Sequence, residues 1–354
     1  MNNMLDNAAS CRPYPWAAEL FAEKSMELYA NQESAGAAGV SAAKAVELAG
    51  EQLASALAPG YGVFFCNTGT DALHLAVRAV LENRQNAVSL TTKAEHPALL
   101  HALEEYSSLR YCKMEKSGRI LILDGIRADL AAVHHVNAET GIIQDPAEWK
   151  KELSGTPLLL DTTQSVCKIP VPAGAADFLT VSGCKIGAPC GAALLYRKQY
   201  EKQIRSVRLE KHGIGRCVPA AAAVLSEAVS KGISGLASRR AHAERLRNLL
   251  RESLAGSNVK FTSETEKSSP WINHFLLPGY QSGILVRMFQ GKGITVSAGS
   301  ACSSEEGGPS AVLRAMGYST EEAYSALRVS FFDDTTPEEV LFFANILDEL
   351  LKNY

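Results

Sequence analysis

Apolar and polar residues alternate in two kinds of pattern along the first two thirds of the chain. Apolar residues recur at helical spacing over residues 16–30 and 41–57, with a polar, Gly-containing loop between them. Short apolar runs typical of buried strands begin near residue 62 and recur to residue 196, with helical segments between most of them. This alternation predicts an α/β fold with a mostly parallel, seven-stranded-type sheet covered by helices.

The last third of the chain has a different pattern. Residues 218–255 are strongly helical, and short strands and helices then alternate to a final helix. We therefore expect a large α/β domain over residues 16–236 and a small α+β domain. The small domain takes an irregular segment, residues 1–15, together with residues 237–354, and it carries the loop that contains Cys302.

The composition suits a globular protein and argues against several classes. Of 354 residues, 46% are hydrophobic, which is enough for a large buried core. The net charge of −3, without a basic tail, argues against a nucleic-acid partner. No apolar stretch reaches the roughly 18 residues of a membrane helix, and the first residues do not resemble a secretory signal. We therefore expect a cytoplasmic protein that has no membrane partner.

The eight cysteines are scattered, with no Cys-x-x-Cys pair, so we expect no metal site. In a reducing cytoplasm most of them should be free thiols, and most neighbour apolar runs that would bury them. Cys302 differs because it lies in a Gly/Ser-rich segment, residues 298–308. A cysteine in such a loop can be exposed and ionised, so we expect Cys302 to be a nucleophile.

A lysine directly follows one of the predicted strands. Residues 180–191 read Thr-Val-Ser-Gly-Cys-Lys-Ile-Gly-Ala-Pro-Cys-Gly, which places Lys185 between a strand end and a Gly/Pro-rich turn. Such an amine is partly desolvated, and desolvation favours the neutral form that a Schiff-base lysine needs. A lone lysine in a loop is more often an ordinary surface residue.

Other polar residues could complete a site around Lys185, because ligands of such sheets bind at the carboxyl ends of strands. Asp161 could face a pyridinium nitrogen and make the ring an electron sink. His96 could serve as an acid or base, and Arg328 could bind a substrate carboxylate. The turn at residues 67–70, which opens a helix, could bind a phosphate. Each also has an ordinary structural role as an alternative, in a cap or an ion pair.

Four motifs together resemble those of the cysteine desulfurases, in the class V aminotransferase group of fold-type I pyridoxal-phosphate (PLP) enzymes. Residues 135–141 (His-Val-Asn-Ala-Glu-Thr-Gly) resemble the family's His-Val-Asn-Asn-Glu-x-Gly, and residues 161–168 (Asp-Thr-Thr-Gln-Ser-Val-Cys-Lys) resemble its Asp-Ala-Thr-Gln-Ser-x-Gly-Lys. Residues 298–302 (Ala-Gly-Ser-Ala-Cys) resemble the cysteine loop of the members in which that loop is long, and residues 313–317 match Leu-Arg-Ala-x-Gly. The likeness covers nearly the whole chain.

The resemblance implies a role for each candidate. Lys185 would hold PLP as a Schiff base, Asp161 would pair with the pyridine nitrogen, and His96 would stack on the ring. Cys302 would be the nucleophile. The remaining implied contacts are Asn137 and Gln164 to the ring hydroxyl, Gly69, Thr70 and Ser182 to the phosphate, and Arg328 with Asn137 to the substrate carboxylate.

The activity implied by the resemblance is that of a PLP-dependent cysteine desulfurase. Such an enzyme converts L-cysteine to L-alanine and leaves a persulfide on its cysteine, here Cys302. A sulfur-acceptor protein then takes the sulfur for iron–sulfur cluster or thio-cofactor synthesis. Enzymes of this fold usually place the site at a dimer interface, so we expect a homodimer.

Two departures from the family pattern lie near the expected phosphate site. Cys184 stands where the family has a phosphate-binding histidine, and Cys217 stands where it has a threonine. Two alternatives therefore stay open. One is a PLP enzyme for another substrate, such as a selenocysteine or cysteine-derivative lyase or an aminotransferase, which its product would reveal. The other is a desulfurase-like scaffold without cofactor, which the yellow colour of bound PLP would exclude.

Overall fold

The computed structural model describes residues 3–122, 125–207, 215–299 and 308–352. Its large sheet has the strand order β2-β9-β8-β7-β6-β3-β4-β5. Strands β8, β7, β6, β3 and β4 are parallel to one another, whereas β9 runs antiparallel to β2 and β8, and β5 antiparallel to β4. The strands are β2 (Tyr61–Cys66), β3 (Val88–Thr92), β4 (Ser108–Met114), β5 (Ile120–Leu121), β6 (Leu130–His134), β7 (Leu158–Asp161), β8 (Phe178–Ser182) and β9 (Ala192–Arg197).

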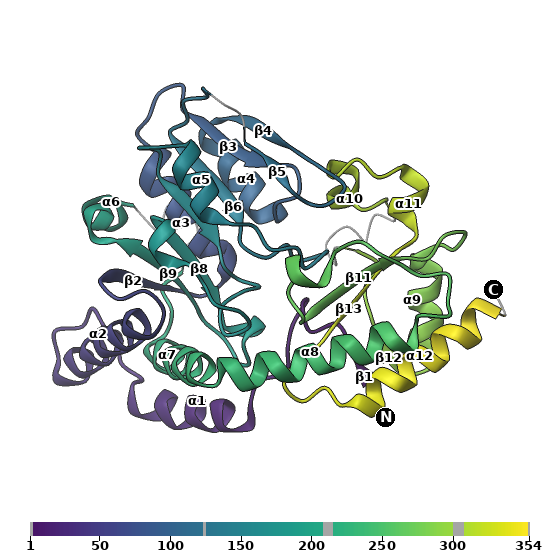
Figure 1. The fold of residues 1–354 in the computed structure, drawn as a ribbon. Coiled ribbons are helices and arrows are strands. Elements are labelled where there is room, and N and C mark those ends of the chain that lie inside the picture. Colours follow the sequence, from purple (N-terminus) through teal and green to yellow (C-terminus); the bar gives the residue numbers. More distant parts are fainter. Residues whose placement is uncertain (1–2, 123–124, 208–214, 300–307, 353–354) are drawn as a thin grey trace.

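The mostly parallel sheet predicted from the sequence is confirmed; over the described residues it has eight strands, and the two-residue β5 forms one edge. Helices cover both faces (Figure 1). Successive strand residues face opposite sides, so that Leu179 joins the core under α2, α5 and α7, while Phe178 joins the core under α3, α4 and α6. The helices of this part are α1 (Pro15–Glu27), α2 (Ala37–Leu57), α3 (Gly69–Leu81), α4 (Pro97–Tyr106), α5 (Pro146–Glu152), α6 (Glu201–Ser206) and α7 (Pro219–Ser234).

The rest of the chain packs around a separate core beside the large sheet. It contains an antiparallel sheet, β10-β11-β13, and a parallel pair, β1-β12. Both chain ends lie in this part (Figure 1). Its elements are β1 (Asn3–Met4), α8 (Leu236–Ser253), β10 (Lys260–Phe261), β11 (Ile272–Leu276), α9 (Ser282–Gly291), β12 (Ile294–Thr295), α10 (Ala311–Ala315), α11 (Thr320–Tyr324), β13 (Ala326–Ser330) and α12 (Pro337–Lys352).

The N-terminal segment departs from the irregular structure expected of it. Asn3 and Met4 form β1, which pairs with β12, and Asp6 makes a bridge to Ser330 at the end of β13. The beginning of the chain is therefore fixed against the C-terminal sheet. Within the described ranges, none of the helices is long and apolar enough to cross a membrane.

Candidate active site

Lys185 ends a short 3₁₀ turn, Gly183–Lys185, that directly follows β8. A Cβ at Gly183 would lie 2.6 Å from the carbonyl oxygen of Cys190, so only glycine allows the turn to pack this closely. The side chain of Lys185 is half-buried, and its Nζ donates a hydrogen bond to the carbonyl oxygen of Ala9. Its amine is thus held by a neutral acceptor at the carboxyl end of the sheet.

Asp161 is the last residue of β7 and is largely buried. Its Oδ1 accepts hydrogen bonds from the hydroxyl of Thr180, at 2.8 Å, and from the amide of Thr163, at 3.0 Å. No hydrogen bond within the described residues involves Oδ2. The carboxylate is therefore oriented by one oxygen and keeps the other available to a ring nitrogen.

His96 caps the start of α4, where its Nδ1 accepts a hydrogen bond of 3.1 Å from the amide of Ala98. A neutral imidazole that accepts at Nδ1 carries its proton on Nε2. The residue is partly exposed, yet loss of water around the ring lowers the pKa of His96 below its usual value. Asp161 raises this pKa and Lys185 lowers it further, because both charges lie near the imidazole. Asp161 and Lys185 thus lie close enough to His96 to act on its charge.

Gln164 is buried between two fixed partners. Its Nε2 donates to the carbonyl oxygen of Ala8 and its Oε1 accepts from Nζ of Lys168, both at 2.8 Å. Burial lowers the pKa of Lys168 to about 8. One N–H of Gln164 stays available for a ring hydroxyl. Lys168 is the last residue of the motif at residues 161–168, but the sequence alone did not suggest a role for it.

Asn137 follows β6 and organises the turn over residues 137–141. Its Oδ1 accepts from the amides of Glu139 and Thr140, at 3.0 and 2.9 Å, and its Nδ2 donates to the carbonyl oxygen of Ala94, at 3.1 Å. Gly141 has a φ of +73°, which favours glycine there. Only one amide hydrogen of Asn137 remains for a cofactor or substrate.

The three residues predicted to bind a phosphate lie together. Helix α3 begins at Gly69 with a capping box, in which the Thr68 hydroxyl accepts from the amide of Asp71. This leaves the amides of Gly69 and Thr70 without a partner in the helix. A Cβ at Gly69 would lie 3.4 Å from Cβ of Ser182, so the helix start faces the end of β8.

The two cysteines that replace family residues occupy different surroundings. Cys184 is half-buried, and its Sγ lies 3.3 Å from the Ser182 hydroxyl, beside the predicted phosphate site. Cys217 is buried, and burial raises its pKa to about 12. Burial likewise raises the pKa of Cys11 to about 11 and that of Cys167 to about 12. These three are protonated thiols at neutral pH. Within the described part of the chain, no cluster of side chains could hold a metal ion.

Arg328, on β13, is buried and already has partners. Its Nη2 donates to Oδ1 of Asp6 at 2.6 Å, and its Nη1 donates to the carbonyl oxygen of Ala138 at 2.8 Å. Its buried Nε has no hydrogen-bond partner among the described residues. The predicted carboxylate-binding residue therefore lies in a nearly buried ion pair that leaves its Nε–H without a partner among the described residues.

Residues 6–9 form a wall of the site that sequence reasoning missed. Asp6 pairs with Arg328, the carbonyl oxygen of Ala8 accepts from Gln164, and the carbonyl oxygen of Ala9 accepts from Lys185. Two of these contacts use backbone atoms. No side-chain pattern could reveal them.

Cys302 lies outside the described residues, but the residues on both sides of it share a partner. The Ser310 hydroxyl donates to Oε1 of Glu139, and a Cβ at Gly299 would lie 3.1 Å from the same oxygen. Glu139 is buried, and its Oε1 lies 3.5 Å from Nε2 of His274. A buried carboxylate beside Asn137 thus binds Ser310 on one flank of the cysteine loop and lies close to Gly299 on the other.

This arrangement of side chains is suited to PLP. The N-terminus of α3 and the Ser182 hydroxyl form a cradle that favours a phosphate group. Asp161 offers an oxygen to a pyridine nitrogen, and the Lys185 amine lies within the same region. Each reactive part of PLP therefore has a suitable partner: the helix start for its phosphate, Asp161 for its ring nitrogen and Lys185 for its aldehyde.

The comparisons with known proteins agree with this assignment. A family model described as aminotransferase class-V matches residues 3–343, and the chain belongs to that family. The cysteine desulfurase IscS of Mannheimia succiniciproducens is 28% identical over 382 residues, spanning 98% of this chain and 92% of its own. The IscS of Pectobacterium carotovorum subsp. carotovorum is 28% identical over 326 residues, spanning 85% and 80%.

The fold also matches solved structures. A NifS-like protein from Rickettsia africae superposes on this chain with a TM-score of 0.86, covering 99% of both chains at 23% identity. The large mixed sheet and the smaller C-terminal part are therefore those of the fold-type I PLP-dependent aminotransferases. The fold class predicted from the sequence is confirmed.

Proposed function

We propose that this chain is a PLP-dependent cysteine desulfurase that converts L-cysteine to L-alanine and leaves the sulfur as a persulfide on Cys302. The observation that carries the proposal is the meeting of Lys185, Asp161 and His96 at the carboxyl end of one sheet. Membership in the class-V family and the names of the similar chains support the choice of substrate.

The chain's own groups divide the work. PLP, when bound, supplies a protonated ring that accepts the electron pair left when the α-proton of the substrate is removed. Nζ of Lys185 removes that proton, and Oδ2 of Asp161 keeps the ring nitrogen protonated. His96 would lie against the ring and offer its Nε2–H as an acid. Arg328 and the free N–H of Asn137 orient the substrate carboxylate.

Cys302 completes the reaction. Its thiolate attacks the sulfur of the substrate, and the carbon–sulfur bond breaks. The electron pair of that bond stays on the β-carbon, which takes a proton and becomes the methyl group of alanine, and Nζ of Lys185 returns the proton to the α-carbon. The sulfur remains on Cys302 as a persulfide and is passed to a thiol acceptor.

Replacing Cys302 with alanine tests the covalent step. The purified variant should keep the yellow absorbance of bound PLP but form neither alanine nor sulfide from L-cysteine with dithiothreitol present. Wild-type protein without dithiothreitol should form about one alanine per site and then stop. A keto acid in place of alanine would assign another PLP reaction, and sulfide release by the variant would contradict the covalent route.

The expected homodimer is part of this proposal. Large apolar side chains are exposed on and after α1 and on α2, at Met26 (83% exposed), Tyr29 (78%) and Val40 (59%). A twofold interface over these helices would cover them. Sedimentation velocity should show a dimer that Tyr29→Asp with Val40→Asp dissociates, and a wild-type monomer would contradict it. Iron–sulfur cluster or thio-cofactor synthesis in the cytoplasm is the proposed setting.

A further inference from the structure

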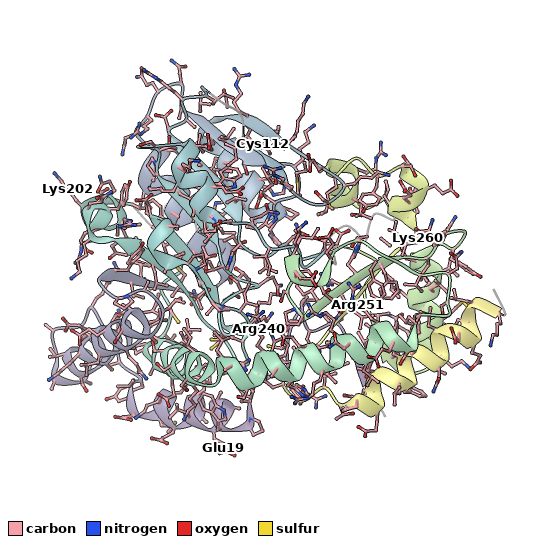
Figure 2. The ribbon with its side chains drawn as sticks, viewed as in Figure 1. Glu19, Cys112, Lys202, Arg240, Arg251 and Lys260 are labelled. Atoms are coloured by element: carbon pink, nitrogen blue, oxygen red, sulfur yellow. The ribbon has the colours of Figure 1, made fainter. Side chains whose placement is uncertain are left out.

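A groove of about 990 Å³ lies at the outer edge of the large sheet, where β4 faces α10. Cys112, labelled in Figure 2, marks this strand. The lining contains basic side chains but, among the described residues, no acidic one. The basic residues are Lys93, Arg110, Lys113, Arg127 and Arg314. The basic groove is therefore a concentrated positive surface on a chain whose 38 acidic residues outnumber its 35 lysines and arginines.

These five cations are exposed, and none forms an ion pair with another described residue. Two of them have other contacts that hold them at the groove. Nζ of Lys93 lies 5.3 Å from the centre of the Tyr111 ring, and Nη1 of Arg314 donates to the carbonyl oxygen of Tyr318 at 2.5 Å. Their charges are thus fixed in place without being neutralised.

Protection of an edge strand explains only part of this pattern. Basic side chains on edge strands prevent unwanted pairing, and Arg110 and Lys113 both lie on β4. Lys93 comes from the loop between β3 and α4, Arg127 from the segment before β6, and Arg314 from α10. Convergence from separate elements points to a binding surface.

The apolar part of the lining indicates what kind of molecule would fit. It includes the side chains of Val88, Leu109, Met114 and Ile126. A nucleic-acid backbone offers negative charge but little apolar surface. A protein segment that combines acidic residues with apolar ones offers both, so it complements the whole lining.

The groove is also joined to the predicted site. Lys93 and His96 share one loop, and Arg314 lies on the helix that follows Ser310. The turn between β4 and β5 contacts α11, because Nζ of Lys116 lies 3.4 Å from a carboxylate oxygen of Glu322. A molecule in the groove would therefore lie against the element that closely follows Cys302 in the chain.

We propose that the basic groove binds an acidic, apolar-containing segment of the protein that receives sulfur from Cys302. This rests on the proposed desulfurase function and adds the site and chemistry of its partner. In the transfer step, a thiolate of the acceptor attacks the outer sulfur of the persulfide. A new sulfur–sulfur bond forms on the acceptor, and Cys302 leaves as a thiolate, so no oxidant or reductant is needed.

The test uses the holoenzyme loaded with L-[³⁵S]cysteine and two synthetic peptides that each contain one cysteine. One peptide alternates Glu and Asp with Leu, and its partner replaces each acid by the corresponding amide. Label should reach the acidic peptide about tenfold faster at low salt, and the preference should fall as salt rises. Arg110→Glu with Lys113→Glu should abolish the preference. Lys202→Glu with Lys260→Glu, exposed cations elsewhere, should keep it.

Alanine formation with dithiothreitol separates this proposal from the proposed function. The charge-reversal variant should keep its wild-type rate, because these residues do not touch the reacting atoms. Equal labelling of both peptides by an active enzyme would overturn the docking proposal alone. Tighter binding of a single-stranded oligodeoxynucleotide than of the acidic peptide, measured by fluorescence anisotropy at the same salt, would also overturn it.

Discussion

The two sides of the candidate site are held by different kinds of interaction. The strand-end side consists of Asp161, Thr180, Ser182 and Gly69. There a hydroxyl and an amide from neighbouring segments of the large sheet orient the Asp161 carboxylate. On the charged side, Arg328 is held by a carboxylate from the opposite end of the chain. The first side is ready to receive a cofactor, whereas the second has buried charges that already neutralise one another.

This difference indicates how each side responds to change. A hydrogen bond from a hydroxyl or amide to a carboxylate acts locally and contributes about 1.5–3 kcal/mol. A buried ion pair adds little net stability, but it is costly to break because one charge is left without its partner. Loss of a group on the charged side should therefore act mainly on stability, and loss of a group on the strand-end side mainly on chemistry.

The largest effect is expected for Asp6→Asn. This variant leaves the Arg328 guanidinium buried without its carboxylate, which should lower the free energy of unfolding by about 3–5 kcal/mol in urea titrations. The weaker hold on Nη2 of Arg328 should also lower KM for L-cysteine. Asp129→Asn, which breaks the exposed pair with Arg84, should cost about 1 kcal/mol or less. Equal losses of unfolding free energy in the two variants, or a KM of Asp6→Asn that does not fall, would contradict the roles assigned to Asp6 and Arg328.

Asp161→Asn should act on chemistry instead. Loss of the charge opposite the ring nitrogen should lower kcat by about 10²–10³-fold while PLP stays bound. Asp177→Asn is a matched control, because Asp177 is also buried and accepts from the amide of Leu158 at the other end of the sheet. That control should lose stability and keep kcat. Steady-state alanine formation and urea unfolding of both variants would distinguish them. If Asp177→Asn lost as much kcat as Asp161→Asn, the catalytic role of Asp161 would be contradicted.

Lys168 should give stability a pH dependence. Its pKa is about 8 in the folded chain and near 10.5 when unfolded. Between these values the unfolded chain binds more protons, so the stability that Lys168 contributes rises with pH. From pH 7.5 to 9.5, wild type should gain about 2 kcal/mol relative to Lys168→Met. Urea unfolding of both proteins at the two pH values measures this, and parallel changes would exclude a neutral buried amine.

The smallest effect is expected for the capping box of α3. Thr68→Ala should cost about 1 kcal/mol of stability and weaken PLP binding, because the amides of Gly69 and Thr70 lose their fixed direction. Ser319→Ala removes a similar capping box from α11, far from the site, and should cost about as much without changing PLP affinity. Equal PLP dissociation constants, from absorbance titration of the apoproteins, would contradict a phosphate site at α3.

The two sides of the site also differ in how well they could be predicted from the sequence. The strand-end side could be located because each of its residues lies next to a buried apolar run, and parallel strands bring those ends together. On the charged side only Arg328 could be predicted. Its pairing with Asp6 could not, because the two meet across nearly the whole chain, and the carbonyls of Ala8 and Ala9 leave no side-chain pattern. Helices α6 and α11 are too short to show a period.

Several predictions from the sequence remain predictions. The division at residues 236 and 237 is one of them, and the cofactor contacts of each site residue are others. Cys302 lies outside the described residues, so its role depends on the motif around it and on Glu139, which binds Ser310 and lies close to Gly299. Glu139 belongs to the motif at residues 135–141, but its contact with Ser310 is known only from the structure.

Reductive trapping tests the central claim most directly. Borohydride treatment of the yellow holoenzyme converts a lysine–PLP Schiff base into a stable secondary amine, which peptide mass spectrometry can locate. The account predicts a phosphopyridoxyl group on Lys185, with none on the buried Lys168. A label on Lys168 or on any other lysine, or a protein that binds no PLP, would contradict it.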